Sequence, residues 1–346
     1  LGGVFILLTL YAFVRGVSGA TWSRGWASVA IGAAWVGVTA KETVVTAPLL
    51  VWLYDRAFVA GGFRAAWRQR RGFYLALGAA WLPLLALLVA GGGTRGVAAG
   101  LGLGVSSWDY LLTQTGAIVR YLALAVWPHP LVLDYGTAVV RSWQQAVVPG
   151  VIVLGLLGWA VWLLVRRPRA GLVAVWAFVL LAPSSSVVPL VTQTIAEHRM
   201  YLPLAGPVVA VALALARWRP RWAIPLVLTF ASVLGLITVR RALQYRDPVV
   251  IWSDTVAHAP DNPRAEHNLG LALQQAGDGA AAEGHYARAV ALDPRYVPAR
   301  YAWGLARLQR DDLGGAVAQF EAVVVQEPRH ADAGLDRKST RLNSSH

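Results

Sequence analysis

Long apolar runs dominate residues 1–246, and short segments that contain arginine separate them. A helix that crosses a membrane needs about 20 predominantly apolar residues. The pattern therefore predicts an all-α chain that begins with a polytopic helical membrane domain. The clear candidate spans are Phe73–Ala90, Val147–Val165, Ala170–Leu190, Tyr201–Ala216 and Trp222–Val239, with Leu1–Val14 as the tail of another.

The segment Trp26–Tyr54 fits two arrangements. Its apolar run is interrupted by Lys41 and Glu42 and then by Pro48. A hairpin with its tip outside the membrane agrees with the parity of the other crossings. The alternative is one long tilted helix with an internal ion pair, which places the preceding arginines on the opposite side.

The segment Ser107–Trp127 carries Asp109 and Arg120 on an otherwise apolar helical pattern, and PHPLVLDYG follows it. We expect an interfacial or re-entrant helix, because charged side chains are costly in the hydrocarbon core. With this choice the chain crosses the membrane eight times and begins and ends outside. Everything after Arg246 then lies on the non-cytoplasmic side.

Basic residues are distributed unevenly over the two parts of the chain. Residues 1–246 contain 21 basic and five acidic residues, whereas residues 247–346 contain 10 and 13. The positive-inside rule makes the more basic loops cytoplasmic. The opposite side holds seven basic residues. The loops expected to be cytoplasmic hold 13 arginines: Arg15, Arg24, Arg56, Arg64, Arg68, Arg70, Arg71, Arg166, Arg167, Arg169, Arg217, Arg219 and Arg221.

Composition excludes several classes of function. The chain is 56% hydrophobic and only 14% charged, which is too apolar for an ordinary soluble protein. A nucleic-acid partner is not expected, because the basic excess lies between the apolar runs. Without cysteine there are no disulfides, cysteine zinc sites or thiol catalysis.

Both ends of the sequence have unusual features. Leu1 begins in the middle of an apolar run, so we expect that the natural N-terminus lies further upstream. Residues 336–346, DRKSTRLNSSH, resemble the translation of a common sequencing adapter, and we expect them not to be native.

Residues 247–335 repeat with a period of 34 and resemble tetratricopeptide repeats. We expect a half repeat at Pro248–His258, two repeats that begin at Pro263 and Val297, and a third that begins at Ala331 and is cut off. The resemblance implies an α-solenoid whose concave groove binds an extended peptide, with a simple spacer as the alternative. The equivalent positions are Pro260, Pro294 and Pro328; Gly270 and Gly304; Leu271 and Leu305; Ala282 and Ala316; Tyr286 and Phe320.

Five carboxylates lie within the apolar part of the chain. We expect Asp55 to be a solvated partner of the neighbouring arginines, and Asp109 to be structural at the start of its helix. The other three fall on the predicted outer face: Glu42, Asp134 and Glu197.

The outer face holds the candidate chemistry. Lys41, His198 and Arg199 are candidates to hold an anionic headgroup, because each can donate a charge-assisted hydrogen bond. The alternative is that these residues cap helices and form interfacial ion pairs. A shared headgroup requires Cα separations below about 20 Å between two tips, Lys41 and the segment Glu197–Tyr201, given the reach of long side chains. The full set is Lys41, His198, Arg199 and Tyr201 for phosphate, Glu42 and Glu197 as candidate proton carriers, and Asp134 and Tyr135 as further outer-face candidates.

Three motifs in this order, followed by the repeats, resemble a family. They are KETVVTAPLLVWLYD, YLALAVWPHPLVLDYG and AEHRMYLPLAG. Together they resemble the bacterial relatives of the transmembrane-and-tetratricopeptide O-mannosyltransferases over Leu1 to His330.

The resemblance implies a C-type glycosyltransferase of the bacterial inner membrane. Such an enzyme transfers a sugar from a polyprenyl-phosphate carrier to a hydroxyl on the periplasmic side, and the repeats recognise the acceptor protein. The family's general base lies before residue 1, so the resemblance implies that this fragment is inactive. The alternative is a non-catalytic membrane scaffold, and a transporter is less favoured. The sequence assigns no residue to a metal, and it leaves the sugar, the acceptor and any cofactor open.

Overall fold

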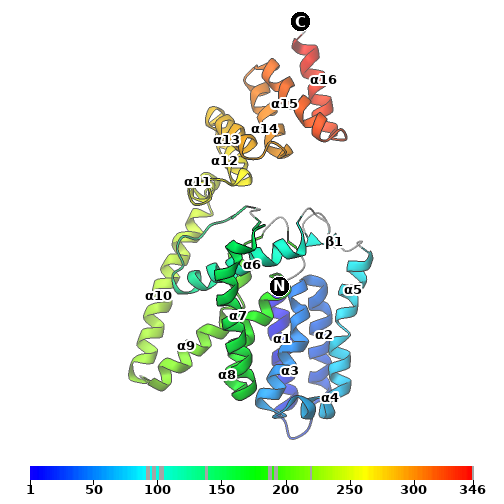
Figure 1. The fold of residues 1–346 in the computed structure, drawn as a ribbon, viewed down its shortest axis with the longest axis vertical. Coiled ribbons are helices and arrows are strands. Elements are labelled where there is room, and N and C mark those ends of the chain that lie inside the picture. Colours follow the sequence, from blue (N-terminus) through cyan, green and yellow to red (C-terminus); the bar gives the residue numbers. More distant parts are fainter. Residues whose placement is uncertain are drawn as a thin grey trace. The chain divides into compact units, whose positions relative to one another are not determined.

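The computed structural model describes residues 1–90, 94–95, 99–100, 105–136, 139–185, 189–190, 194–218 and 220–344. In this part of the chain all regular secondary structure is helical, apart from the two-residue strands β1 (Thr94–Arg95) and β2 (Ala99–Gly100). The chain forms two compact units (Figure 1). Unit 1 comprises Leu1–His129 and Val139–Leu228, and unit 2 comprises Pro130–Ala138 and Thr229–His346.

The helices of unit 1 follow the predicted runs. The bounds are α1 (Gly2–Val17), α2 (Arg24–Ala40), η1 (Glu42–Thr46), α3 (Ala47–Phe58), α4 (Phe63–Gly78), α5 (Trp81–Ala90), α6 (Ser107–Val126), α7 (Trp143–Arg166), α8 (Pro168–Leu181), η2 (Glu197–Met200) and α9 (Ala205–Trp218). Helix α10 (Pro220–Gln244) begins in unit 1 and ends in unit 2.

Small residues allow α1 and α2 to pack closely. Ala27, Ala30 and Ala34 follow one face of α2 and are buried. At Gly37, on the same face, an added Cβ would lie 2.6 Å from the Cβ of Phe5. A larger side chain there would force the two helices apart.

The segment Trp26–Tyr54 is broken at Lys41. Helix α2 ends at Ala40, Lys41 has an extended backbone conformation, and α3 begins at Ala47 after the short helix η1. Pro48 lies in the first turn of α3, where its missing N–H leaves no hydrogen bond unmade. The alternative of one continuous helix is therefore wrong.

Two helices, α7 and α10, are long and apolar enough to cross a membrane. In each, only 6% of the most apolar 18-residue window is buried, so neither is the core helix of a soluble protein. Helices α8 and α9 have 14 residues each, about 21 Å of rise, which is shorter than a full span. The predicted span Phe73–Ala90 is divided between α4 and α5. Eight crossings therefore stay a prediction.

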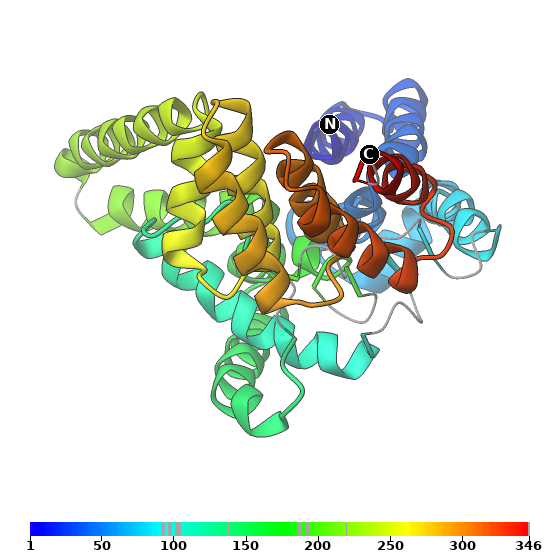
Figure 2. The ribbon, with the colours of Figure 1, turned by 90° about the horizontal axis from the view of Figure 1, so that it is seen from above.

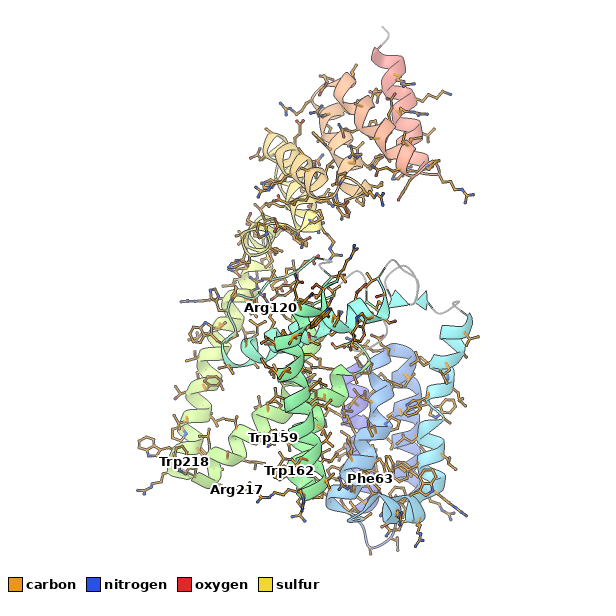
Figure 3. All side chains as sticks on the ribbon, in the orientation of Figure 1. Phe63, Arg120, Trp159, Trp162, Arg217 and Trp218 are labelled. Carbon is orange, nitrogen blue, oxygen red and sulfur yellow. The ribbon has the colours of Figure 1, made fainter. Side chains whose placement is uncertain are left out.

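The arginine-rich loops lie at one end of unit 1. Arg56 Nη1 donates a 2.7 Å hydrogen bond to the carbonyl of Leu164, and the guanidinium of Arg169 lies 5.7 Å from the ring centre of Phe58. Figure 3 shows Phe63, Trp159, Trp162, Arg217 and Trp218 toward this end, with Arg120 toward the other. This segregation is typical of a membrane domain that follows the positive-inside rule.

Asp55 differs from its prediction. Its carboxylate is fully buried and accepts hydrogen bonds from Arg70 Nη1 at 2.9 and 3.0 Å and from the hydroxyl of Tyr74. The arginine partner was expected, but the buried surroundings were not. Asp109 is structural as predicted: Ser106 caps α6, and its hydroxyl donates to the Asp109 carboxylate at 2.8 Å.

Unit 2 contains helices that recur every 34 residues. The bounds are α11 (Pro248–His258), α12 (Pro263–Gln275), α13 (Gly279–Leu292), α14 (Val297–Gln309), α15 (Leu313–Gln326) and α16 (Ala331–Ser344). Figure 2 shows α12 to α15 following one another in chain order. Helix α16 extends through residues 336–344, and Thr340 is buried. The foreign origin of residues 336–346 stays a prediction.

Glycine and aromatic residues explain this recurrence. An added Cβ on Gly270 would lie 2.5 Å from the ring of Tyr286, and one on Gly304 would lie 2.6 Å from the ring of Phe320. Each glycine therefore lets one helix of a pair press against the buried aromatic residue of the other. The same contact appears in both pairs.

Candidate functional site

The two tips predicted to share a headgroup meet at the start of α1. An added Cβ on Gly2 would lie 3.0 Å from the Cβ of Lys41. On Gly3, it would lie 3.9 Å from the ring of Tyr201 and from Leu202. The glycine pair therefore lies against both segments, most tightly against Lys41.

Lys41 and His198 lie within electrostatic reach of each other. Partial burial lowers the pKa of His198 below its ordinary value of 6.5, and the charges of Lys41 and then of Arg199 lower it further. The imidazole is therefore neutral at pH 7, although its side chain reaches the surface. Lys41 is also exposed. A bound anion would favour protonation of His198.

Arg199 is directed toward the protein interior. Its Nη1 donates hydrogen bonds to the carbonyls of Ser184 at 3.3 Å and Thr194 at 3.4 Å and to the hydroxyl of Tyr110 at 3.5 Å. These bonds give Arg199 an anchoring role in the loop after α8. Its contact with a phosphate stays a prediction.

The candidate proton carriers are the sequence neighbours of Lys41 and His198. Glu42 opens η1 directly after Lys41, and Glu197 opens η2 directly before His198. Both carboxylates are half-buried. Tyr201, which follows η2, is 83% exposed.

Asp134 and Tyr135 belong to unit 2. The Asp134 carboxylate accepts hydrogen bonds from Nε and Nη2 of Arg264, the latter at 2.6 Å, and also from the backbone N–H of Gly136. Asn262 donates to the backbone carbonyl of Asp134 at 2.9 Å. The carboxylate of Asp134 is thus engaged by an arginine far along the chain, which gives it a structural contact. Its role as an outer-face candidate stays a prediction. Tyr135 is half-buried in the same loop.

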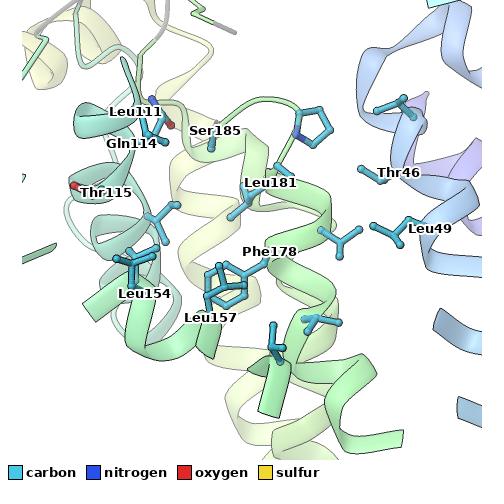
Figure 4. A pocket seen from close by; sticks show the side chains of 18 of the residues that line it. Thr46, Leu49, Leu111, Gln114, Thr115, Leu154, Leu157, Phe178, Leu181 and Ser185 are labelled. Atoms are coloured by element: carbon cyan, nitrogen blue, oxygen red, sulfur yellow. The ribbon is translucent and has the colours of Figure 1, made fainter. Parts of the chain in front are cut away.

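Unit 1 also contains an apolar cavity of about 1350 Å³ (Figure 4). Its walls come from α3, α6, α7 and α8, with contributions from η1, α4 and α5. The sequence did not predict it, because its residues come from helices that no local pattern brings together. The sequence feature that could have pointed to the cavity is its tryptophans, since five of them line it: Trp52, Trp67, Trp81, Trp108 and Trp143.

Helix η1 connects the cavity to Lys41. Val45 and Thr46, in the second half of η1, line the cavity, and Lys41 immediately precedes the helix. An apolar chain and a negatively charged head could therefore occupy adjoining places. Among the described residues, no group of three His, Asp or Glu side chains could hold a metal ion.

Three buried polar atoms on residues that line the cavity have no hydrogen-bond partner in the described part of the chain. They are Trp52 Nε1, Gln114 Oε1 and Ser185 Oγ. Buried polar atoms in native proteins are nearly always paired, so such atoms indicate a place where a further molecule can bind.

Comparison with known proteins gives one informative match. No model of a known protein family matches the chain. Over 116 residues, 33% of the chain, the sequence is 31% identical to protein O-mannosyl-transferase F38B6.6 of Caenorhabditis elegans. The match spans 17% of the length of that protein. It supports a distant relationship to a glycosyltransferase.

Proposed function

We propose that this chain is part of a membrane glycosyltransferase that transfers a sugar from a polyprenyl-phosphate carrier to a hydroxyl of a protein on the non-cytoplasmic face. The observation that carries the proposal is that Lys41 and the segment after His198 both pack against the start of α1, and that η1, which follows Lys41, lines an apolar cavity. The distant similarity to an O-mannosyl-transferase supports the same reaction class.

In this proposal Lys41 neutralises the phosphate of the carrier, and His198 gains a proton as the phosphate binds. The bond between the anomeric carbon and the phosphate oxygen breaks, and a bond from the acceptor oxygen to that carbon forms. The hydroxyl proton passes to a carboxylate, and the carrier leaves as polyprenyl phosphate. Glu42 and Glu197 are the candidates within this chain.

The remaining assignments are parts of the same proposal. Unit 1 is a polytopic domain of the C-type glycosyltransferase kind, and α11 to α16 form a tetratricopeptide solenoid. The recurring glycine-aromatic contacts at Gly270 and Gly304 support the solenoid. The solenoid would hold the acceptor protein on the periplasmic side of a bacterial inner membrane.

A non-catalytic membrane scaffold is the second candidate. Arg199 favours it, because this cation hydrogen-bonds to backbone carbonyls of the protein. In a scaffold, Lys41 and His198 would need no anionic ligand.

Binding to the chain in lipid nanodiscs distinguishes the two candidates. The probes are a polyprenyl-phosphate sugar and the matching polyprenyl phosphate. We expect Lys41→Met to weaken binding of both about tenfold, because one charge-assisted hydrogen bond is lost. Arg64→Met is the control, since it removes an exposed cation of the arginine-rich helix α4. Equal affinity of wild type and Lys41→Met would favour the scaffold.

A further inference from the structure

Two of the unpartnered atoms belong to one end of the cavity. Gln114 is 1% exposed and Ser185 is 7% exposed, and both line the cavity. Arg199 Nη1 donates both to the carbonyl of Thr194, which also accepts from Gln114, and to the carbonyl of Ser184, which precedes Ser185. Figure 4 draws Gln114 and Ser185 toward one end of the lining, with Leu154, Leu157 and Phe178 further from that end. The cavity wall is therefore apolar over most of its extent and polar at one end.

The orientation of the Gln114 amide follows from its surroundings. Its Nε2 donates a 2.9 Å hydrogen bond to the carbonyl of Thr194, so the nitrogen must face that oxygen. Oε1 then remains as an acceptor without a partner among the described residues. The Ser185 hydroxyl can both donate and accept.

This pair of atoms selects the chemistry of a ligand. An alcohol hydroxyl can donate to Gln114 Oε1 and accept from Ser185 Oγ, and so it satisfies both atoms at once. A phosphate or carboxylate is disfavoured, because Gln114 presents an oxygen to it. The nearby Arg199 Nη1 already donates to the carbonyls of Ser184 and Thr194.

We infer that the cavity is a binding site for a long-chain amphiphile with a neutral, hydroxyl-bearing head. The hydrocarbon chain lies along the apolar walls, and the hydroxyl bridges Gln114 and Ser185. Long-chain alcohols are the simplest members of this class. In the proposed function the carrier's hydrocarbon chain would use the same cavity, but the inference is separate, since the carrier's phosphate is assigned to Lys41 and His198 and the neutral hydroxyl to Gln114 and Ser185.

Photo-crosslinking of the whole chain in nanodiscs tests the inference. The probes have one diazirine-bearing hydrocarbon chain and end in a hydroxyl, a phosphate or a methyl group. We expect the alcohol to label cavity residues about tenfold more than the alkane. We expect Ser185→Ala and Gln114→Leu to reduce alcohol labelling to the alkane level. Because Gln114→Leu also removes the bond to Thr194, Ser185→Ala decides the result if Gln114→Leu fails to fold.

Thr115→Val is the matched control. Thr115 lines the same cavity, but its hydroxyl already donates to the carbonyl of Leu112 at 2.7 Å. Its alcohol labelling should match that of wild type. Lys41→Met should leave labelling by the alcohol probe unchanged and reduce labelling by the phosphate probe. Failure of the proposed function would therefore appear with the phosphate probe, and failure of this inference with the alcohol probe.

A thermal measurement adds a second readout. Without probe, Ser185→Ala should unfold at the same temperature as wild type or higher, because it removes an unpartnered hydroxyl. With the alcohol, wild type should gain stability and the variant should not. Equal labelling by alcohol and alkane, unchanged alcohol labelling in Ser185→Ala, or labelling by none of the probes would overturn the inference.

Discussion

The guanidinium of Arg264 donates two parallel hydrogen bonds to the carboxylate of Asp134, which lies 130 residues earlier in the chain. Asn262, the N-cap of α12, donates to the carbonyl of the same aspartate. The loop that contains Asp134 is thereby held against the start of α12. Arg241 adds a further contact, from Nη2 to the carbonyl of Leu131 at 2.8 Å.

This pair should contribute measurably to the stability of unit 2. In a double-mutant cycle with Asp134→Asn and Arg264→Met, we expect a coupling free energy of about 1–2 kcal/mol, because the pair is bidentate and only partly exposed. Hydrogen exchange of α12 amides measures it. The exposed pair Glu321 and Arg341 is the control and should couple by less than about 0.5 kcal/mol. Equal coupling in the two pairs would contradict the prediction.

Lys41 should control the protonation of His198. The charge of Lys41 disfavours the imidazolium, so Lys41→Met should raise the pKa of His198 toward its ordinary value of 6.5. NMR titration of the His198 ring measures this shift. Arg64→Met should leave the titration curve unchanged. A curve that is unaltered by Lys41→Met would mean that the two side chains do not interact.

His267 should make unit 2 sensitive to mild acid. Burial lowers its pKa to about 4, and its ring packs against Tyr286 and Tyr296. The unfolded chain therefore binds a proton near pH 6.5, whereas the folded chain does not until about pH 4. Stability is fully present above pH 6.5 and falls as the pH drops toward 4, by up to about 3 kcal/mol.

Hydrogen exchange of α12 and α13 between pH 7 and pH 4.5, corrected for intrinsic rates, measures this loss. His267→Leu should flatten the pH dependence across that window. A slope in the variant equal to that of wild type would assign the acid sensitivity to other groups.

The glycines at the helix contacts should tolerate no side chain. Gly304→Ala places a Cβ within 2.6 Å of the Phe320 ring, so we expect a loss of about 1–3 kcal/mol in unfolding free energy. Gly284→Ala is the matched control, because no atom lies within 4 Å of its added Cβ within helix α13. That substitution should stabilise the protein by up to about 1 kcal/mol. Denaturant titration of both variants decides whether the close contact exists.

Membrane orientation can be tested with reporter fusions. We expect alkaline phosphatase to be active when fused after Arg246 and inactive after Arg68, because the arginine-rich loops favour the cytoplasm. A reporter that functions only in the cytoplasm should show the opposite pattern. Cytoplasmic location of the fusion after Arg246 would make the eight-crossing arrangement wrong.

The sequence alone determined where several helices lie. Apolar periodicity predicted the runs that became α1, α6, α7 and α10. The charges at Lys41 and Glu42 marked an interruption before α3 and left open whether the segment breaks there, and the break of Phe73–Ala90 between α4 and α5 was not predicted. It also predicted the 34-residue recurrence of α12, α14 and α16. These features depend on local backbone hydrogen bonding and on residue spacing, which a single segment already contains.

Only the tertiary structure decided which polar residues are engaged and which surround a cavity. Asp55 became buried against Arg70 and Tyr74, and Asp134 became the partner of Arg264. Arg199 turned toward backbone carbonyls. The cavity, with Gln114 and Ser185 at one end, forms from seven separate elements. Such contacts depend on how distant helices pack, and the free energy of that packing is not expressed in the pattern of any one segment.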